Sequence, residues 1–216
     1  MKSRQLYLFL LLIPGFLSAQ KRIGELTLMY NYTVGNGSDV AKQMNATATF
    51  YIKGNLSRAE INSGNLFSST TIYDSKAGSG VILKEVNGQK LLIRLSKENW
   101  NQKNSRFDNI HFTRTSETRM IAGYSCFKAT AVTAGGYQIT VFYTRDLIPE
   151  NKAYDAPFKN LDGLPLEYEF SKGDLHIKYV LASINLNPVP ASKFDIPTSG
   201  YREMTYDESL KLKLNN

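Results

Sequence analysis

The stretch from Glu117 to Tyr206 decides the fold of this chain, because four of its blocks punctuate strands. The blocks read Glu117-Thr-Arg-Met-Ile-Ala-Gly-Tyr-Ser-Cys126, Tyr143-Thr-Arg-Asp-Leu-Ile-Pro149, Gly163-Leu-Pro-Leu-Glu-Tyr-Glu169 and Phe194-Asp-Ile-Pro-Thr-Ser-Gly-Tyr201. Gly permits tight turns and Pro cannot donate to a sheet ladder, so both residues stop strands. None of the blocks supplies the chemistry of an active site. They predict the fold, a β-protein, and they do not identify its ligand.

Alternation of apolar and polar residues extends this pattern over most of the chain, as expected for half-buried strands. A first strand places on one face Leu26, Leu28, Tyr30, Tyr32 and Val34, and on the other Glu25, Thr27, Asn31 and Thr33. Further strands are predicted at 46–53, 56–61, 67–74, 81–86, 90–95, 120–132, 137–144, 166–170 and 175–184. Hairpin turns are expected at Gly54-Asn55, Asn87-Gly88, Gly135-Gly136 and Lys172-Gly173-Asp174, where Gly supplies positive φ.

The expected fold is therefore mainly β, a curved antiparallel meander of about ten or eleven strands. Such a meander must curl or close to hide its edges. Helix is sparse. Short helices are predicted at 96–103, with Ser96 as N-cap, and at 207–214, capped by Asp207, while 37–44 is a turn or an irregular helix.

The N-terminus is typical of an exported protein. Lys2 and Arg4 precede the apolar run 6–16, and Ala19 offers a small residue for cleavage before Gln20. We expect residues 1–19 to be a signal peptide and 20–216 a single β-rich domain. Its Pro-containing segment 188–216 either packs on the sheet or extends from it. The mature chain has no further segment able to span a membrane, so we expect a periplasmic or outer-envelope-associated protein that is soluble after cleavage.

Charge and residue usage exclude several functional classes. The formal charge of +7 is spread along the chain without a basic run, which argues against nucleic-acid binding. The lone Cys126 lies in a strand-like context and is expected to be a packed, inert thiol. His176 is expected on a solvated face and His111 half buried, and neither has a partner at metal-ligand spacing. Glu167 and Glu169 share one strand face, as in a strand with one wet side. We therefore predict no catalytic, cofactor-binding or metal-binding residues, and no enzyme.

Aromatic residues are plentiful: 13 Tyr and 11 Phe against a single Trp. One explanation is strand propensity, since aromatic side chains suit a half-buried pleated surface. The other is a curved sheet with an aromatic-lined concavity that receives an apolar ligand. The sheet must hide its apolar face by closing, by being plugged with its helices, or by holding a ligand.

Three segments suggest a family. Residues 121–126 (Ile-Ala-Gly-Tyr-Ser-Cys), 141–144 (Val-Phe-Tyr-Thr) and 163–166 (Gly-Leu-Pro-Leu) resemble the exported bacteroidete proteins named for a Gly-Leu-Pro-Gly-Leu-Ile (GLPGLI) signature. They are still more similar to a neighbouring group of unknown function in which Pro-Leu-Glu follows the Gly. Phe-Asp-Ile-Pro at 194–197 resembles the closing segment of that group. The chain departs from the named signature after Pro165, where Leu166-Glu167 replaces Gly-Leu. The resemblance implies a half-barrel similar to periplasmic lipoprotein carriers, and no activity or catalytic residue.

These observations leave two functional classes open. The first is a non-catalytic binding protein or carrier for a lipid or lipoprotein, which would lie in the concave face of the sheet. The alternative is a structural or protein-interaction module of the cell envelope that uses an exposed strand edge or the segment from Pro188 onward. A hydrolase is a distant third, because no nucleophile and base form a set. The sequence identifies neither the ligand nor the partner.

Overall fold

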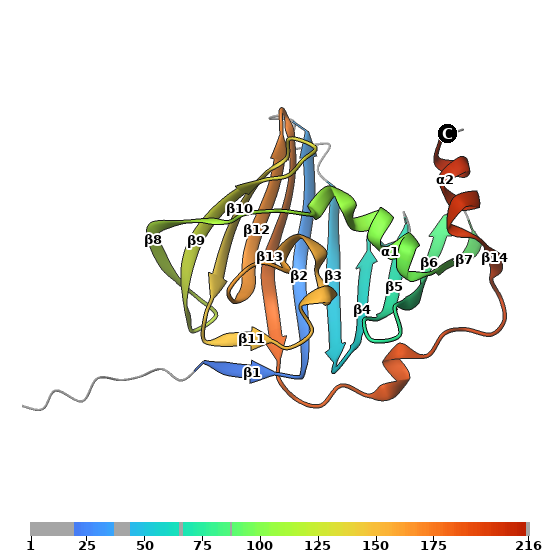
Figure 1. Cartoon of the computed structure of the whole chain (residues 1–216), viewed down its shortest axis with the longest axis horizontal. Helices are drawn as coiled ribbons and strands as arrows, with labels where there is room; N and C mark the ends of the chain where they lie inside the picture. Colours follow the sequence, from blue (N-terminus) through green and yellow to red (C-terminus); the bar gives the residue numbers. More distant parts are fainter. Residues whose placement is uncertain (1–19, 37–43, 65–66, 87, 215–216) are drawn as a thin grey trace, which may run out of the picture.

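The chain is described here in a computed structural model that covers residues 20–36, 44–64, 67–86 and 88–214 (Figure 1). Within these residues one large sheet contains β2 (Glu25–Asn36), β3 (Met44–Lys53), β4 (Leu56–Asn62), β5 (Ser68–Asp74), β6 (Ser79–Val86), β7 (Gln89–Leu95), β8 (Thr113–Ile121), β9 (Tyr124–Val132), β10 (Gln138–Thr144), β12 (Leu164–Lys172), β13 (Leu175–Asn185) and β14 (Arg202–Met204). A small parallel pair contains β1 (Lys21–Ile23) and β11 (Leu147–Pro149). The helices and 3-10 turns are α1 (Lys97–Asn104), η2 (Ser105–Phe107), η3 (Lys152–Tyr154), η4 (Ala156–Phe158), η5 (Ala191–Phe194) and α2 (Tyr206–Leu214).

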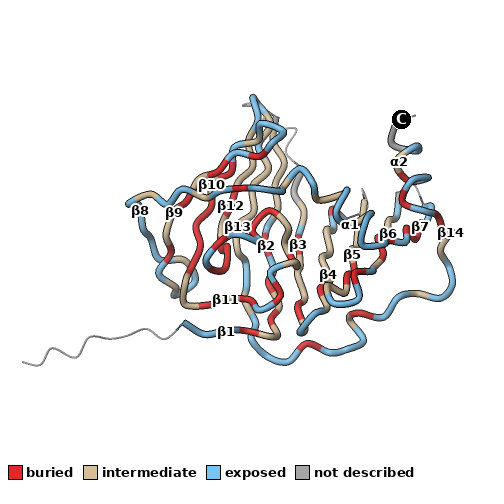
Figure 2. The backbone as a smooth tube through the Cα atoms, in the orientation of Figure 1, coloured by how far each residue is buried: buried red, intermediate tan, exposed pale blue. Residues whose placement is uncertain are grey.

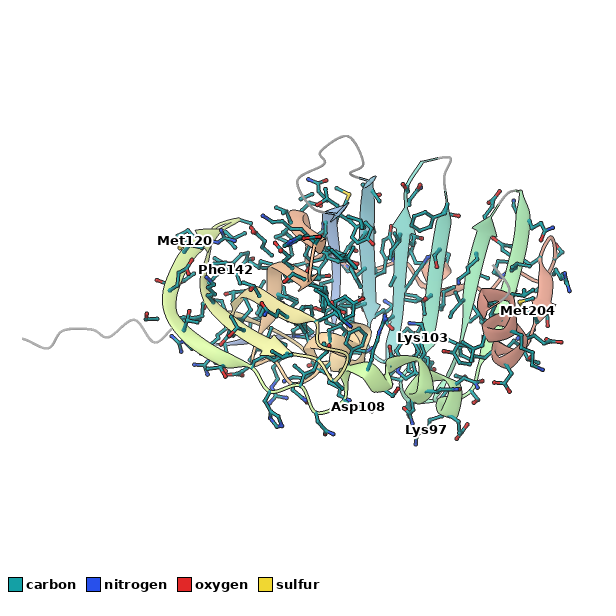
Figure 3. All side chains as sticks on the ribbon, turned by 90° about the horizontal axis from the view of Figure 1, so that it is seen from above. Lys97, Lys103, Asp108, Met120, Phe142 and Met204 are labelled. Atoms are coloured by element: carbon teal, nitrogen blue, oxygen red, sulfur yellow. The ribbon has the colours of Figure 1, made fainter. Side chains whose placement is uncertain are left out.

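The large sheet is a curved half-barrel, as predicted. Its strand order is β14-β7-β6-β5-β4-β3-β2-β13-β12-β10-β9-β8, and neighbours are antiparallel except for β14 and β7. The sheet bends so that β8 and β9 curl over on the side where α1 lies, and its two ends stay apart (Figures 1 and 3). Two meanders, β2 to β7 and β8 to β13, meet at the long pairing between β2 and β13.

The strand predicted at 120–132 is wrong as a single element. It is a hairpin: β8 ends at Ile121 and β9 begins at Tyr124. The two turn residues, Ala122 and Gly123, have φ values of 50° and 84°. Two successive positive φ values match the twist of antiparallel strands, so the chain reverses here instead of continuing. The additional strand β8 becomes one edge of the sheet.

The predicted helices are present, with one corrected cap. The backbone N–H of Asn99 donates to the Ser96 hydroxyl at 3.2 Å, so Ser96 caps α1 as expected. The cap of α2 is Thr205 and not Asp207, because the Thr205 hydroxyl accepts from the N–H of Glu208 at 3.2 Å while the Glu208 carboxylate accepts from the N–H of Thr205. This reciprocal pair is a capping box, and Asp207 lies within the first turn. The predicted signal peptide lies outside the described residues, as does the turn or irregular helix predicted at 37–44 except for Met44, which begins β3.

The main core lies on the concave face, along β2, β10 and β12 (Figure 2). Leu164 and Leu166, which follow Gly163, are completely buried. A side chain at Gly163 would place its Cβ 2.1 Å from the carbonyl oxygen of Thr144, so only glycine fits. The buried Tyr30 hydroxyl donates to the carbonyl oxygen of Pro165 at 2.8 Å. That bond ties β2 to the corner on the neighbouring meander.

The C-terminal segment runs past the lower ends of the strands between β13 and β14 in Figure 1, and it packs on the opposite, convex face. Its Val189 and Phe194 are buried against a cluster formed by Ile72, Val81, Leu83 and Leu92. The Arg58 guanidinium donates to the carbonyl oxygen of Lys193 at 2.8 Å, and the N–H of Val189 donates to the Glu25 carboxylate at 2.8 Å. The segment therefore packs on the sheet. It covers apolar side chains that β4 to β7 would otherwise expose.

Candidate functional site

A hollow of about 420 Å³ lies in the concave face, between the sheet and α1. The sheet forms its floor, while α1 with η2 and the turns η3 and η4 form its walls. Apolar and aromatic groups make up most of its surface. The lining residues are Tyr32, Phe50, Ala59, Ile61, Ser69, Thr71, Trp100, Lys103, Asn104, Arg106, Phe107, Thr133, Gly135, Tyr137, Tyr154, Asp155, Ala156, Pro157, Tyr168, Phe170, Ile177 and Tyr179.

Stacked aromatic rings form the floor, because alternate residues of β2, β12 and β13 point to the concave side. The rings of Tyr168 and Tyr179 stack with their centroids 4.4 Å apart, and the ring of Tyr32 lies 4.7 Å from that of Tyr179. Phe50 on β3 continues the layer, edge-on to Tyr154 at 5.9 Å. Rings at these spacings attract one another beyond the area that they bury, so the floor is preorganised for an apolar ligand.

One aromatic stack attaches α1 to the sheet above the hollow. The ring of Trp100 lies parallel to that of Tyr73 on β5, with 3.7 Å between centroids and 7° between planes. None of the residues of α1 is buried. In Figure 3, Lys103 points from α1 toward the sheet and Lys97 points away from it. The helix therefore acts as a wall over the hollow and is held mainly by one side chain.

The hollow contains charges of both signs. The Lys103 ammonium lies 5.5 Å from the ring centroid of Trp100, and the Arg106 guanidinium lies 4.6 Å from that of Phe107. Asp155, between η3 and η4, is half-buried. Burial raises the pKa of its carboxyl from 3.8 to about 7, although the nearby Lys103 acts to lower it. Asp155 is therefore close to the boundary between its charged and neutral forms at neutral pH.

The tyrosine hydroxyls near Asp155 stay protonated. Burial raises the pKa of Tyr30, Tyr154 and Tyr168 well above the usual value, and the Asp155 charge raises each further. The hydroxyl of Tyr154 is buried, and no hydrogen-bond partner is found for it in the described part of the chain. An unpaired buried hydroxyl is costly, so this site has unused hydrogen-bonding capacity.

The residues singled out from the sequence lie outside this hollow. Cys126 is completely buried, as predicted, and burial raises the pKa of its thiol to about 11. His111 is exposed, so the expectation that it is half buried is wrong. His176 is exposed as predicted, with Nδ1 2.7 Å from the Glu169 carboxylate. The Glu167 carboxylate is paired with two basic side chains on the outer face, Arg119 at 2.7 Å and Lys178 at 3.3 Å.

The polar residues of the hollow were missed in the sequence. Lys103 and Arg106 come after Ser96, the capping residue of α1. No pattern of charges in the sequence marks either of them as facing a hollow. Tyr154 and Asp155 lie in irregular backbone between strands, where no periodicity marks a side chain as inward-facing. The alternation predicted for the first strand was the one usable signal, because it placed Tyr32 on the face that forms the floor.

A second hollow of about 460 Å³ lies near β9 and β10, below the loop that precedes β8. It is lined by Ile110, His111, Phe112, Arg114, Ala129, Tyr143, Asn160, Leu161 and Asp162. Fewer side chains enclose it, and it lacks the stacked rings of the first hollow. The described residues also contain no group of three or more His, Cys, Asp or Glu that could hold a metal ion. The aromatic hollow is therefore the better candidate site.

Comparisons with known proteins identify the fold alone. No family model matches the chain, so its resemblance to the GLPGLI group stays a prediction. No curated protein matches it in sequence either. Among solved structures, PNGF-II is similar with a TM-score of 0.51 and 14% identity over 86% of this chain, which spans 32% of PNGF-II. This chain thus corresponds to about a third of that protein's length.

Two further solved structures are similar at lower TM-scores. An uncharacterized conserved protein from Thermus thermophilus aligns with a TM-score of 0.47 and 11% identity, covering 82% of this chain and 90% of that one. The lipoprotein LppX from Mycobacterium tuberculosis aligns with a TM-score of 0.33 and 11% identity, covering 76% of this chain and 88% of that one.

None of the helices in the described residues is long and apolar enough to cross a membrane.

Proposed function

We propose that this chain is a binding protein or carrier for an amphipathic ligand, held in the aromatic hollow of the half-barrel. The observation that supports the proposal is the hollow itself, about 420 Å³ in volume and floored by stacked rings. Pockets of roughly 300–1,000 Å³ with mostly apolar walls and a few polar groups are typical of small-molecule sites. The volume suits a single acyl chain or a ligand of similar bulk. The proposed role is non-catalytic, and it assigns no reaction to the residues of the hollow.

The place of action is part of the same proposal. A signal peptide at 1–19 would export the chain, leaving 20–216 as a single β-rich domain in the periplasm or at the outer envelope. There the ligand would be a lipid, or the lipid-modified end of a lipoprotein. Such a ligand needs shelter from water during transfer, which a half-open apolar hollow provides.

A pair of substitutions on one strand tests this function. Thr71 lines the hollow, whereas its neighbour Thr70 faces the other side of β5. Trp100 is the only tryptophan of the chain and lines the hollow, so its fluorescence reports on occupancy. We expect decanol, an uncharged single-chain amphiphile, to change this fluorescence, and Thr71→Phe to weaken binding about tenfold or more by filling the hollow.

The matched control is Thr70→Phe, which adds the same ring outside the hollow and should leave decanol affinity within about twofold. Native mass spectrometry of the protein purified from envelope extracts should also show bound amphiphile. Binding that is unaffected by Thr71→Phe, or lost equally in both variants, would place the ligand elsewhere and contradict the proposal.

The alternative, an interaction module of the cell envelope, has one specific observation in its favour. In the described part of the chain, β8 pairs with β9 alone, and most of its residues are exposed. An edge strand of this kind can accept a strand from a partner. A photo-crosslinking residue placed at Ser116 should then capture an envelope protein, whereas the same residue at the exposed Asn101 on α1 should not. Equal capture at both positions would count against this function.

A further inference from the structure

Asp155 is a carboxylate without a hydrogen-bond donor of its own. None of the described side chains or backbone N–H groups donates to its carboxylate oxygens, although its backbone carbonyl accepts from the N–H of Phe158 at 3.0 Å. The side chain lines the hollow and is half-buried, so water reaches it only in part. A carboxylate in such a place is costly unless something pairs with it. The pairing group can therefore come from a ligand.

A second, independent observation comes from the preceding residue in the chain. The Tyr154 hydroxyl is buried, belongs to the same lining, and has no hydrogen-bond partner among the described residues. Tyr154 is only 8% exposed, so bulk water cannot replace the missing partner. A carboxylate that accepts and a hydroxyl that both accepts and donates can together hold a group with several N–H donors.

The surroundings of Asp155 favour positive charge in that group. Four tyrosines on three strands and on η3 are close enough for the Asp155 charge to raise their pKa: Tyr30, Tyr154, Tyr168 and Tyr179. Aromatic faces carry negative electrostatic potential and attract ammonium groups, most strongly where water is excluded. The Asp155 carboxylate and the tyrosine rings therefore both favour a positively charged group in the ligand.

The cations of the hollow belong to a different element. Lys103 and Arg106 extend from α1 and η2, and each lies over an aromatic ring of its own segment, Trp100 or Phe107. Arg106 is exposed to water. Lys103 is the cation of the wall that acts on Asp155, and its field only partly offsets the burial of the carboxylate. An anionic head bound by these two cations remains the competing arrangement, and the test separates the two.

We propose that the hollow binds its ligand through an ammonium group, held by the Asp155 carboxylate, the Tyr154 hydroxyl and the surrounding tyrosine rings. The ligand class is an amphiphile with an apolar chain and a primary or secondary amine. This inference rests on the proposed binding function and specifies the chemistry of the ligand's head. The apolar chain lies along the aromatic floor toward Phe50 and Phe170.

The test compares three probes that share one chain: decylamine, decanol and decanoate, titrated at pH 8.5 with Trp100 fluorescence and calorimetry. At this pH the alkylamine is charged, since amines of the lysine type titrate near 10.4, and Asp155 is ionised. We expect decylamine to bind about tenfold or more tightly than decanol. The preference should shrink as the pH falls below 7, because a protonated Asp155 no longer attracts the ammonium.

Substitutions assign the preference to the named groups. Asp155→Asn should weaken decylamine about tenfold and leave decanol within about twofold, and Tyr154→Phe should weaken decylamine a few-fold. Lys103→Met removes the opposing cation and should strengthen decylamine binding while weakening decanoate. Glu85→Gln, an exposed carboxylate on β6 outside the lining, is the control and should change nothing. Circular dichroism establishes that each variant is folded.

The outcomes separate the inference from the function on which it rests. Equal affinity for decanol and decylamine, or an equal loss of both in Asp155→Asn, overturns the ammonium site and leaves the binding function intact. Tighter binding of decanoate, abolished in Lys103→Met, assigns the head to the cationic wall instead. If none of the three probes binds, the proposed function fails and the inference fails with it.

Discussion

At the residue scale, Asp155 is unusual because its carboxyl group lies among aromatic side chains. Asp155 lines the hollow, and burial opposes its charge. Groups with strongly perturbed pKa values in a cleft concentrate at functional sites, since stability alone gives no reason to keep them. Cys126 shows the contrasting case. Its thiol is buried in a strand, and burial raises its pKa to about 11.

The pH dependence of stability tests this description of Asp155. Its pKa is raised from 3.8 to about 7 on folding, so the folded state keeps a proton that the unfolded state loses. Stability should therefore fall as the pH rises from about 4 to about 7, and change little above that window for this group. Asp155→Asn removes this effect and should stabilise the protein at pH 8 by on the order of 2 to 4 kcal/mol, with little gain at pH 4.

Urea unfolding at pH 4 and pH 8 measures the difference between the two pH values, with Glu85→Gln as the exposed control. An equal change at both pH values would mean that Asp155 does not carry the shifted pKa.

At the scale of elements, α1 is the least secured wall of the hollow. The helix has no buried residue, and its ring stack with the sheet is the contact between Trp100 and Tyr73. Its N-terminus is well capped by Ser96, so the helix is locally stable yet weakly attached. An element of this kind can move to admit a ligand without disturbing the sheet.

Trp100→Ala should detach α1 from the sheet. Loss of a half-exposed tryptophan stack should cost about 2 kcal/mol, less than the full cost of emptying a core site. Hydrogen exchange at residues 99–104 should accelerate, while exchange in β5 and β6 changes little. Gln102→Ala, on the exposed part of the same helix, is the control. Unchanged protection of α1 in Trp100→Ala would show that another contact holds the helix.

At the scale of the whole molecule, the sheet has two apolar sides and covers them in different ways. The concave side is filled by its own rings, by α1 and by the turns η3 and η4. The convex side of β4 to β7 is covered by the C-terminal segment, which then adds β14 to the sheet edge beside β7. Removing residues 188–216 would expose this second cluster, so the edge strand β8 is the better place to test a protein partner.

Phe194→Ala tests the attachment of that segment. Phe194 is 8% exposed within the convex cluster, so its truncation should lower the free energy of unfolding by about 3 kcal/mol. Ile196, two residues along and 41% exposed, supplies the control: Ile196→Ala should cost less than about 0.5 kcal/mol. Denaturant unfolding followed by circular dichroism measures both. Equal effects would mean that the segment does not protect the sheet.

The fold class was predicted correctly from local sequence patterns. The wrong predictions fell at positions where the local sequence left the structure ambiguous. Alternation placed Leu26, Leu28 and Tyr30 on one buried face, because the side-chain period of a strand is fixed. The break at Ala122-Gly123 was missed, because a non-glycine residue with positive φ leaves no clear sequence signal. The cap of α2 was misplaced by two residues, since Thr205 and Asp207 are both good N-caps.

The sequence by itself determined the mainly β class, most of the hairpins and an aromatic face, since all of these depend on neighbours within a few residues. Tertiary structure alone decided the pairing of β2 with β13, whose partners are more than 130 residues apart, as in Tyr30 and Leu181. That pairing closes the floor, and it brings Asp155, Lys103 and Tyr179 around one hollow. Long-range contacts of this kind depend on sheet curvature and burial summed over many strands, which no local pattern contains.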